Sequence, residues 1–145
     1  MDQDPPPARV RVIATALIRR QNELLLMAVR DSTGQLTGWR PLGGAVEFGE
    51  RAADAVKREF IEELGQPIRD LRPLCVLENL FVDDNQPGHE VVFVFDADFQ
   101  DAAAYDVRQF DFADGSANLV AQWVDLRHFR EGRFLLFPDG LSDRL

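Results

Sequence analysis

Short apolar runs separated by polar turns make up most of the chain outside its central third. Residues 9–18 are rich in β-branched side chains, and residues 90–99 carry the strongest set of strand-forming side chains. Residues 23–30 are almost continuously apolar, which predicts a strand buried on both faces. The polar turn at residues 19–22 predicts that the first two strands form a hairpin.

One region, residues 50–64, has the periodicity of an amphipathic helix. Its apolar positions recur every three or four residues, at Ala53, Val56, Phe60 and Leu64. Gly65 suits the left-handed residue that ends a helix, and Pro67 cannot continue it. No Ser, Thr, Asp or Asn stands where the helix should begin. We therefore expect Gly49 to be the cap, with Glu50 near the positive end of the helix dipole.

The second half of the chain predicts two more strands, at residues 71–82 and 119–124. Residues 101–118 are acidic, and we expect them to form a long loop of the kind that is often functional or mobile. A short helix is expected at residues 125–129. The chain should end in a further helix that begins near Pro138.

Between the second strand and the helix, residues 31–38 predict a polar loop that leads to the paired glycines Gly43 and Gly44. A short strand is expected near residues 45–47. Strands that flank one strong helix, with another helix at the end, predict an α/β fold in which a mixed sheet is covered on both faces. We expect residues 1–8 to be a flexible tail and residues 9–145 to form a single domain.

Composition narrows the classes of function. The 145 residues are 46% apolar, which suits a folded domain with a proper core. Sixteen basic and 25 acidic residues give a net charge of −9. This balance argues against a nucleic acid polymer or an anionic membrane as the main partner, because both require a basic surface.

Cysteine content and the termini point to a reducing, aqueous compartment. Cys75 has no second cysteine with which to form an intramolecular disulfide, and its apolar neighbours predict a buried core thiol. No apolar stretch approaches the roughly 20 residues that span a bilayer, and the first residues lack a secretory pattern. We therefore expect a soluble, cytoplasmic protein.

Three carboxylates on the predicted helix are the main candidate for chemistry. Glu59, Glu62 and Glu63 fall within an arc of roughly 100° on one side of that helix. Like charges at this spacing cost a few tenths of a kcal/mol per pair. A divalent cation such as Mg²⁺ or Mn²⁺ would reverse the sign of that cost, because both ions prefer carboxylate oxygens.

Eight positions around these carboxylates follow a recognisable spacing: Gly44, Glu50, Arg58, Glu59, Phe60, Glu62, Glu63 and Gly65. The segment resembles the signature of the Nudix hydrolases, G-x5-E-x7-R-E-U-x-E-E-x-G-U, in which U is an apolar residue. Gln66 departs from the final apolar position, for which Ile68 is the substitute. The resemblance implies the α/β/α sandwich with a mixed β-sheet of MutT-like proteins, and the subfamily stays open.

The resemblance also implies roles for individual residues. Glu59 and Glu63 would be the main ligands of Mg²⁺ or Mn²⁺, with Glu62 as a further or outer ligand. The backbone carbonyl of Gly43 would be an additional ligand, and Arg58 would orient the first glutamate. The implied catalytic residues are thus Arg58, Glu59, Glu62 and Glu63. The implied reaction is hydrolysis of a pyrophosphate linkage in a nucleoside diphosphate joined to another group. Bound metal would offset the repulsion between the acidic chain and its substrate.

Substrate-binding residues are less well defined, and each candidate has an ordinary alternative. Arg30 and Arg40 are candidates for phosphate contacts or are simple strand-end charges. Trp39 could stack on a base, although core packing is the commoner role of such a residue. Asp139, in FPDG, faintly resembles a purine-contacting residue of some relatives. Sequence features of the dinucleoside polyphosphate, ADP-ribose, NADH and coenzyme A subfamilies are not found.

The general base and the role of Glu50 also stay open. Glu50 is explained equally by the helix dipole and by a metal-related role. Glu90, beside His89, is one candidate for the base, and the helix glutamates and the aspartates of residues 101–118 are others. The alternative to an enzyme is a catalytically inactive Nudix-fold module that binds nucleotides in a regulatory role. A structural role would need a homodimer, for which the sequence shows no specific patch.

Overall fold

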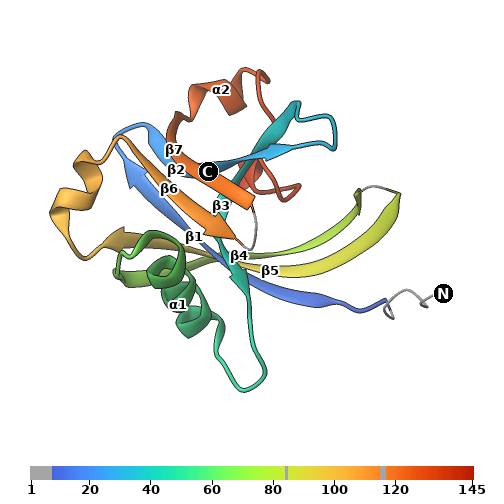
Figure 1. The fold of residues 1–145 in the computed structure, drawn as a ribbon, viewed down its shortest axis with the longest axis horizontal. Helices are drawn as coiled ribbons and strands as arrows, with labels where there is room; N and C mark the ends of the chain where they lie inside the picture. Colours follow the sequence, from blue (N-terminus) through green and yellow to red (C-terminus); the bar gives the residue numbers. More distant parts are fainter. Residues whose placement is uncertain (1–7, 84, 115–116) are drawn as a thin grey trace.

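The computed structural model describes residues 8–83, 85–114 and 117–145, and Figure 1 shows their arrangement. The strands are β1 (Arg11–Arg20), β2 (Glu23–Arg30), β3 (Leu36–Ala45), β4 (Ile68–Asp83), β5 (Gln86–Phe99), β6 (Gln109–Asp114) and β7 (Ala117–Asp125). The helices are α1 (Ala52–Leu64), α2 (Arg127–Arg130) and the short 3-10 helices η1 (Ala102–Asp106) and η2 (Ser142–Arg144). No helix among these described residues is long and apolar enough to cross a membrane.

The described strands form one mixed seven-stranded sheet in the order β4-β5-β1-β3-β2-β7-β6. β1 runs parallel to β5, and its other neighbour β3 is antiparallel. The predicted hairpin between the first two strands is present but short, because β1 and β2 pair only at Arg19–Leu24 and Arg20–Glu23. Beyond those pairs β3 lies between them, which allows its glycines to sit in the middle of the sheet.

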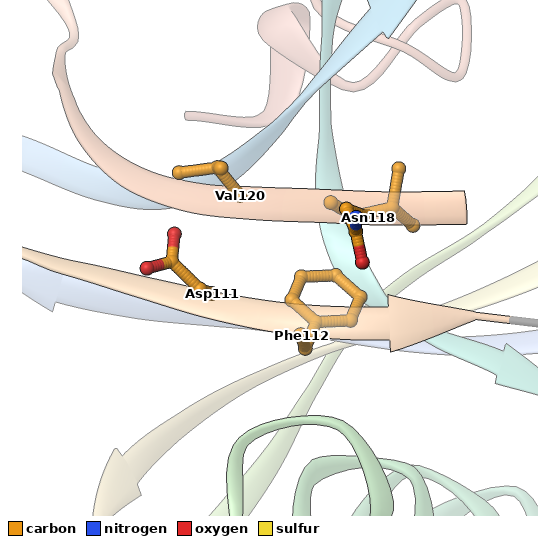
Figure 2. Close-up of a pocket in the computed structure, with 5 residues that line it drawn as sticks. Asp111, Phe112, Asn118 and Val120 are labelled. Carbon is orange, nitrogen blue, oxygen red and sulfur yellow. The ribbon is translucent and has the colours of Figure 1, made fainter. Parts of the chain in front are cut away.

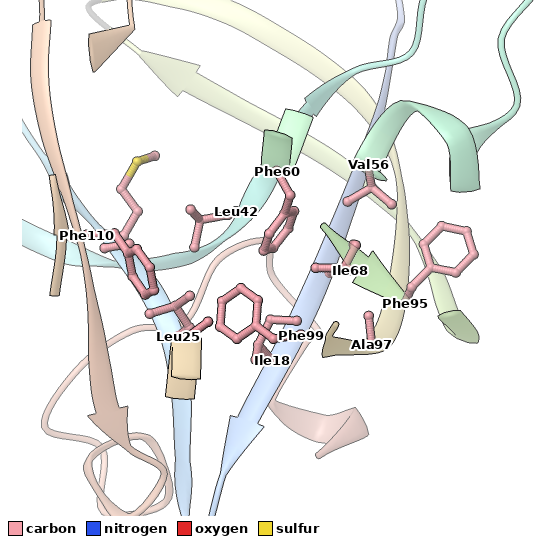
Figure 3. Close-up of a cluster of buried hydrophobic side chains, with 14 of the residues drawn as sticks. Ile18, Leu25, Leu42, Val56, Phe60, Ile68, Phe95, Ala97, Phe99 and Phe110 are labelled. Carbon is pink, nitrogen blue, oxygen red and sulfur yellow. The ribbon is translucent and has the colours of Figure 1, made fainter. Parts of the chain in front are cut away.

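Apolar side chains cover the sheet on both faces. On one face α1 packs over a cluster that includes Leu42, Val56, Phe60 and Phe99, and Figure 3 shows these rings and aliphatic chains together. On the other face, residues of α2 and the C-terminal segment pack on a second cluster that contains Leu17, Leu24 and Val94. The α/β fold with a mixed sheet is therefore confirmed.

The central helix has the predicted apolar stripe and the predicted end. Val56 and Phe60 are fully buried. Gly65 has φ 65°, and its N–H donates to the Ile61 carbonyl at 2.9 Å. The predicted start was wrong. The helix begins at Ala52 with Arg51 in the cap position, and no side chain caps it there.

Two predicted loops are strands. The segment 101–118 contains η1 and β6 and the first residues of β7. β6 alternates buried Phe110 and Phe112 with exposed residues, and this period of two is the signal of a half-buried strand despite the acidic composition. β3 begins at Leu36, inside the expected polar loop, and extends through the glycines to Ala45.

The predicted C-terminal helix from Pro138 does not form among the described residues, apart from the single turn of η2. Instead, the chain before Pro138 pairs with β3. The Trp39 N–H donates to the Leu135 carbonyl at 2.9 Å, and the Phe137 N–H donates to the Trp39 carbonyl at 2.8 Å. The backbone just before Pro138 is therefore held extended beside β3, where Trp39 and Leu136 form a parallel bridge.

Candidate functional site

Two adjacent glycines in β3 allow close packing on both sides of the strand. Thr15 of β1 lies opposite Gly43, and a Cβ atom on Gly43 would approach the Thr15 Cα to 2.7 Å. A Cβ atom on Gly44 would approach the Glu59 Oε1 to 2.6 Å. Contacts this short exclude any side chain larger than glycine without movement. The carboxylate of Glu59 thus lies directly against the backbone of β3.

Arg58 holds this carboxylate in place and links α1 to the end of β3. Its Nη1 donates to Glu59 Oε1 at 3.0 Å, and its Nη2 donates to the Ala45 carbonyl at 3.1 Å. Its Nε and Nη2 donate to the two carboxylate oxygens of Glu50 at 2.8 and 2.9 Å. A guanidinium that binds one carboxylate through two bonds and a second through another fixes both side chains. These are the contacts that an orienting arginine requires.

Glu50 is tied to Arg58 rather than to the helix start. Its side chain is 18% exposed, and it also accepts a hydrogen bond from the Glu47 N–H at 3.1 Å. The hydrogen bond from Arg58, and then the one from Glu47, lower the pKa of Glu50 to about 2. The same ion pairs raise the pKa of Arg58. Glu50 therefore stays charged at any ordinary pH.

The two remaining glutamates of the predicted set lie on the same helix. Glu62 is exposed, and Arg58 Nη1 donates to its Oε2 at 3.3 Å. Glu63, four residues after Glu59, is half-buried. Among the described residues, no three His, Cys, Asp or Glu side chains are grouped as a finished metal site.

The donor set nevertheless fits a hard divalent cation. Glu59 presents carboxylate oxygens at a strand where Gly44 leaves space for them. Glu62 and Glu63 follow on the adjacent turn of α1. Oxygen ligands of this kind suit Mg²⁺ and Mn²⁺.

Two groups that contact Arg58 or Glu50 were missed in the sequence: the Ala45 carbonyl and the Glu47 N–H. The Ala45 carbonyl gives no signal in a sequence, and Glu47 could have been suspected only from its spacing to Glu50.

The candidate substrate residues are distributed around β2 and β3. Trp39 is 8% exposed and packs in the second core cluster, edge-on to Phe134. Core packing, the ordinary alternative for Trp39, is therefore what the structure shows. Arg30 is exposed at the end of β2 and donates to the Gly34 carbonyl at 3.0 Å. Arg40 is exposed on β3, opposite Met27.

Asp139 and Glu90 lie apart from the contacts around Arg58. Asp139 is exposed and lies just after the residues that pair with β3. Its neighbour Gly140 lies over Leu77. The Glu90 carboxylate accepts a hydrogen bond from Asn79 at 3.4 Å and pairs with Arg11 at 3.7 Å. The structure therefore brings together Arg58, Glu50, Glu59 and Glu62, but gives Glu90 partners from β1 and β4.

A pocket of about 370 Å³ lies elsewhere, on the β6–β7 pair (Figure 2). Asp111 and Val120 are cross-strand partners there, and Phe112 faces the same hollow. Its lining contains one acidic side chain and no cation for a phosphate. The chemistry of the residues therefore favours the region around Glu59 over this pocket as the candidate site.

Comparison with known proteins agrees with this geometry. The NUDIX domain family matches residues 7–141. The chain therefore belongs to the Nudix family, and the resemblance in the sequence is confirmed.

Individual relatives are similar over part of their length. The nucleoside triphosphatase NudI of Klebsiella pneumoniae subsp. pneumoniae is 33% identical over 84 residues, which cover 57% of this chain and 60% of that protein. NudI of Escherichia fergusonii is 43% identical over 61 residues, which cover 41% of this chain and 43% of that protein. The chain thus spans about half the length of these relatives.

Solved structures show the same fold. A MutT NUDIX hydrolase from Burkholderia pseudomallei superposes with a TM-score of 0.62 at 26% identity, covering 82% of this chain and 85% of that one. A NUDIX hydrolase from Nitrosomonas europaea gives a TM-score of 0.64 at 16% identity, covering 90% and 82%. The second likeness shows the shared architecture alone.

Proposed function

We propose that the chain is a pyrophosphohydrolase that depends on Mg²⁺, with Mn²⁺ as a substitute. It would cleave a pyrophosphate linkage in a nucleoside diphosphate joined to another group. Membership of the Nudix family and the intact acidic helix support this proposal. The single observation that carries it is the Glu59 carboxylate against Gly44, held there by Arg58.

Hydrolysis forms one P–O bond from water and breaks the P–O bond to the departing phosphate. The proton of the attacking water passes to a basic oxygen, and the phosphate that leaves carries the electron pair of the broken bond. A bound divalent ion would neutralise phosphate charge and make the attacking water more acidic. Glu59, Glu62 and Glu63, with the Gly43 carbonyl, are the groups that would hold this ion.

The other residues act by position. Arg58 fixes the Glu59 carboxylate in one orientation, so less reorganisation is needed when the substrate binds. Its bonds to Glu50 and to the Ala45 carbonyl keep the loop before α1 against the end of β3. We propose two candidates for the base that accepts the proton: a carboxylate of α1, or Glu90.

The substrate is proposed from charge and from the relatives. The NudI relatives are named as nucleoside triphosphatases. We therefore propose a nucleoside triphosphate or a related nucleotide as the substrate of this chain. Arg30 and Arg40, both exposed, are the proposed phosphate contacts. Asp139 is the proposed contact for the base. We also propose that the protein is cytoplasmic, a location that suits a small, soluble nucleotide as substrate.

Hydrolysis by the purified chain with Mg²⁺ tests this assignment. The panel contains nucleoside triphosphates, nucleotide sugars, ADP-ribose and dinucleoside polyphosphates. We expect release of a nucleoside monophosphate from at least one of them. We expect Glu63→Gln to reduce that rate by at least about a hundredfold, since the helix carboxylates hold the ion that stabilises the transition state.

Asp54→Asn is the matched control, because Asp54 is an exposed carboxylate on the first turn of the same helix. It should retain most of the activity. Equal rates in the wild type and Glu63→Gln, or no product from any substrate, would contradict the assignment. The second of these results would favour the inactive nucleotide-binding module.

A further inference from the structure

The sheet extends beyond the region that α1 covers. The distal half of the β4–β5 hairpin and the first residues of β1 project away from both helices as a three-stranded arm (Figure 1). The register places Val12 beside Val91 and Val91 beside Glu78. The cross-strand pair of Val76 and Phe93 marks where the arm begins, because Phe93 still packs against the cluster under α1.

One face of this arm is apolar. Side chains alternate across a strand, so the residues at every second position share one face. We call this surface the arm face, and it consists of Val10, Val12, Val76, Leu80, Val82 and Val91. It is continuous with the sheet face under α1, since Ala14 and Phe93 of the same rows belong to the core there. The opposite face holds Leu77, which packs in the second core cluster.

The arm face is uncovered within the described part of the chain. Val10 is 52% exposed, Leu80 is 67% exposed and Val82 is 73% exposed. Single exposed apolar residues are ordinary, but Leu80 and Val82 lie together on β4, and Val12 and Val91 form a cross-strand pair on β1 and β5 of the same arm. Contiguous apolar patches of this kind mark interaction sites.

We infer that the arm face is the contact surface of a homodimer, in which it packs against the same face of a second copy. The chain carries a net charge of −9, so two copies repel over most of their surfaces. In the same rows as the arm face, this side of the sheet carries one acidic residue, Glu78, and one histidine, His89. It is therefore the surface where two copies meet with little repulsion. An anionic membrane or a nucleic acid would find no cationic footprint on it.

A twofold contact also matches its two polar groups. Glu78 and His89 lie diagonally across β4 and β5, because Glu78 pairs with Val91 and Leu80 pairs with His89. Where the twofold axis of such a contact passes midway between these two groups, Glu78 of one copy lies near His89 of the other rather than beside a like charge. The two arms then pack as a small β-sandwich with the apolar rows between them.

The size of the surface determines the strength of the dimer. Three strands about 4.8 Å apart, with four side-chain rows about 7 Å apart, give a patch of about 400 Å². Standard interfaces bury about 800 Å² on each partner. We therefore expect a weak dimer whose population rises with concentration in the micromolar range or above.

Sedimentation equilibrium of the full chain at about 5 to 500 µM tests this inference. The mean mass should rise from that of a monomer toward twice that value. Leu80→Lys and, separately, Val10→Lys should weaken the dimer at least tenfold, since each places a cation in the apolar contact, one from β4 and one from the residue just before β1. Both side chains are largely exposed, so the fold should survive, and circular dichroism checks that it does.

Ile61→Lys is the matched control, because Ile61 is an apolar side chain of α1 that is 51% exposed and lies outside the arm face. It should leave the dimer unchanged. The inference is overturned by a monomer at 500 µM, by a dimer that both arm variants leave intact, or by a mass that continues to grow beyond the dimer. The last result would indicate open-ended pairing through the edge of β4 instead.

Discussion

At the scale of single residues, the account depends on the missing Cβ of Gly44. Gly44→Ala places a methyl group 2.6 Å from Glu59 Oε1, so the carboxylate must move away from β3. The far end of a flexible side chain can move, so the fold should persist. We expect activity to fall at least tenfold with less than about 1 kcal/mol lost in stability, measured by hydrolysis rate and urea unfolding.

Gly132→Ala separates this effect from backbone strain. Gly132 has φ +72° and open space around it, so alanine there is strained without touching a proposed site residue. This control should lose about 1–2 kcal/mol of stability and keep its activity. If Gly44→Ala retained full activity, the placement of Glu59 would have no part in the chemistry.

Glu50 provides a prediction on pH. Its pKa falls to about 2 in the folded chain, below its ordinary value, so its ion pair stabilises the fold at neutral pH. That contribution is lost as the pH falls from about 4.5 toward 2, where the carboxylate takes up a proton. The difference in the free energy of unfolding between wild type and Glu50→Gln should be constant above about pH 5 and shrink below pH 4.5.

Urea unfolding at pH 7, 5, 4 and 3 measures this difference. If the difference were the same at every pH, the bond from Arg58 would not be the cause of the stabilisation.

At the scale of elements, α1 links the core to the candidate site. Phe60 follows Glu59 directly in α1 and is fully buried, whereas the next residue, Ile61, is exposed. Phe60→Ala should cost about 3–5 kcal/mol because it leaves a cavity under the helix. Ile61→Ala, at an exposed position, should cost less than about 1 kcal/mol. Chemical denaturation measures both, and similar costs for the two variants would mean that α1 is not anchored by this face.

Elements with one strong period were predictable from the sequence. The apolar stripe of α1, its end at Gly65 and the buried strand β2 all follow from local patterns. The start of α1 was not predictable, because Glu50 bonds to Arg58 eight residues later and no side chain caps the helix. β6 was missed because acidic composition outweighed its alternation. The C-terminal segment was missed because its partner, Trp39, is remote in sequence.

At the scale of the whole molecule, the sequence predicted the α/β class and the family but not the sheet order. β3 lies between β1 and β2, a placement that depends on long-range pairing rather than on local propensity. That Glu59, Glu62 and Glu63 share one helix was predictable from their spacing. The bonds from Arg58 to Glu50 and to the Ala45 carbonyl depend on how α1 docks beside β3, which no local pattern contains.

The acidic charge of the chain connects these scales. With a net charge of −9, a nucleotide substrate is repelled unless cations gather at its site. Arg58 alone cannot supply them, because its donors are already engaged by Glu50, Glu59 and Ala45. The central claim is therefore that the acidic face of α1 binds a divalent cation.

Binding of Mn²⁺, followed by electron paramagnetic resonance, tests that claim without any substrate. The wild-type chain should show saturable binding, Glu59→Gln should weaken it at least tenfold, and Asp54→Asn should leave it unchanged. If Mn²⁺ bound equally to the wild type and Glu59→Gln, or did not bind to the wild type at all, the account would be contradicted.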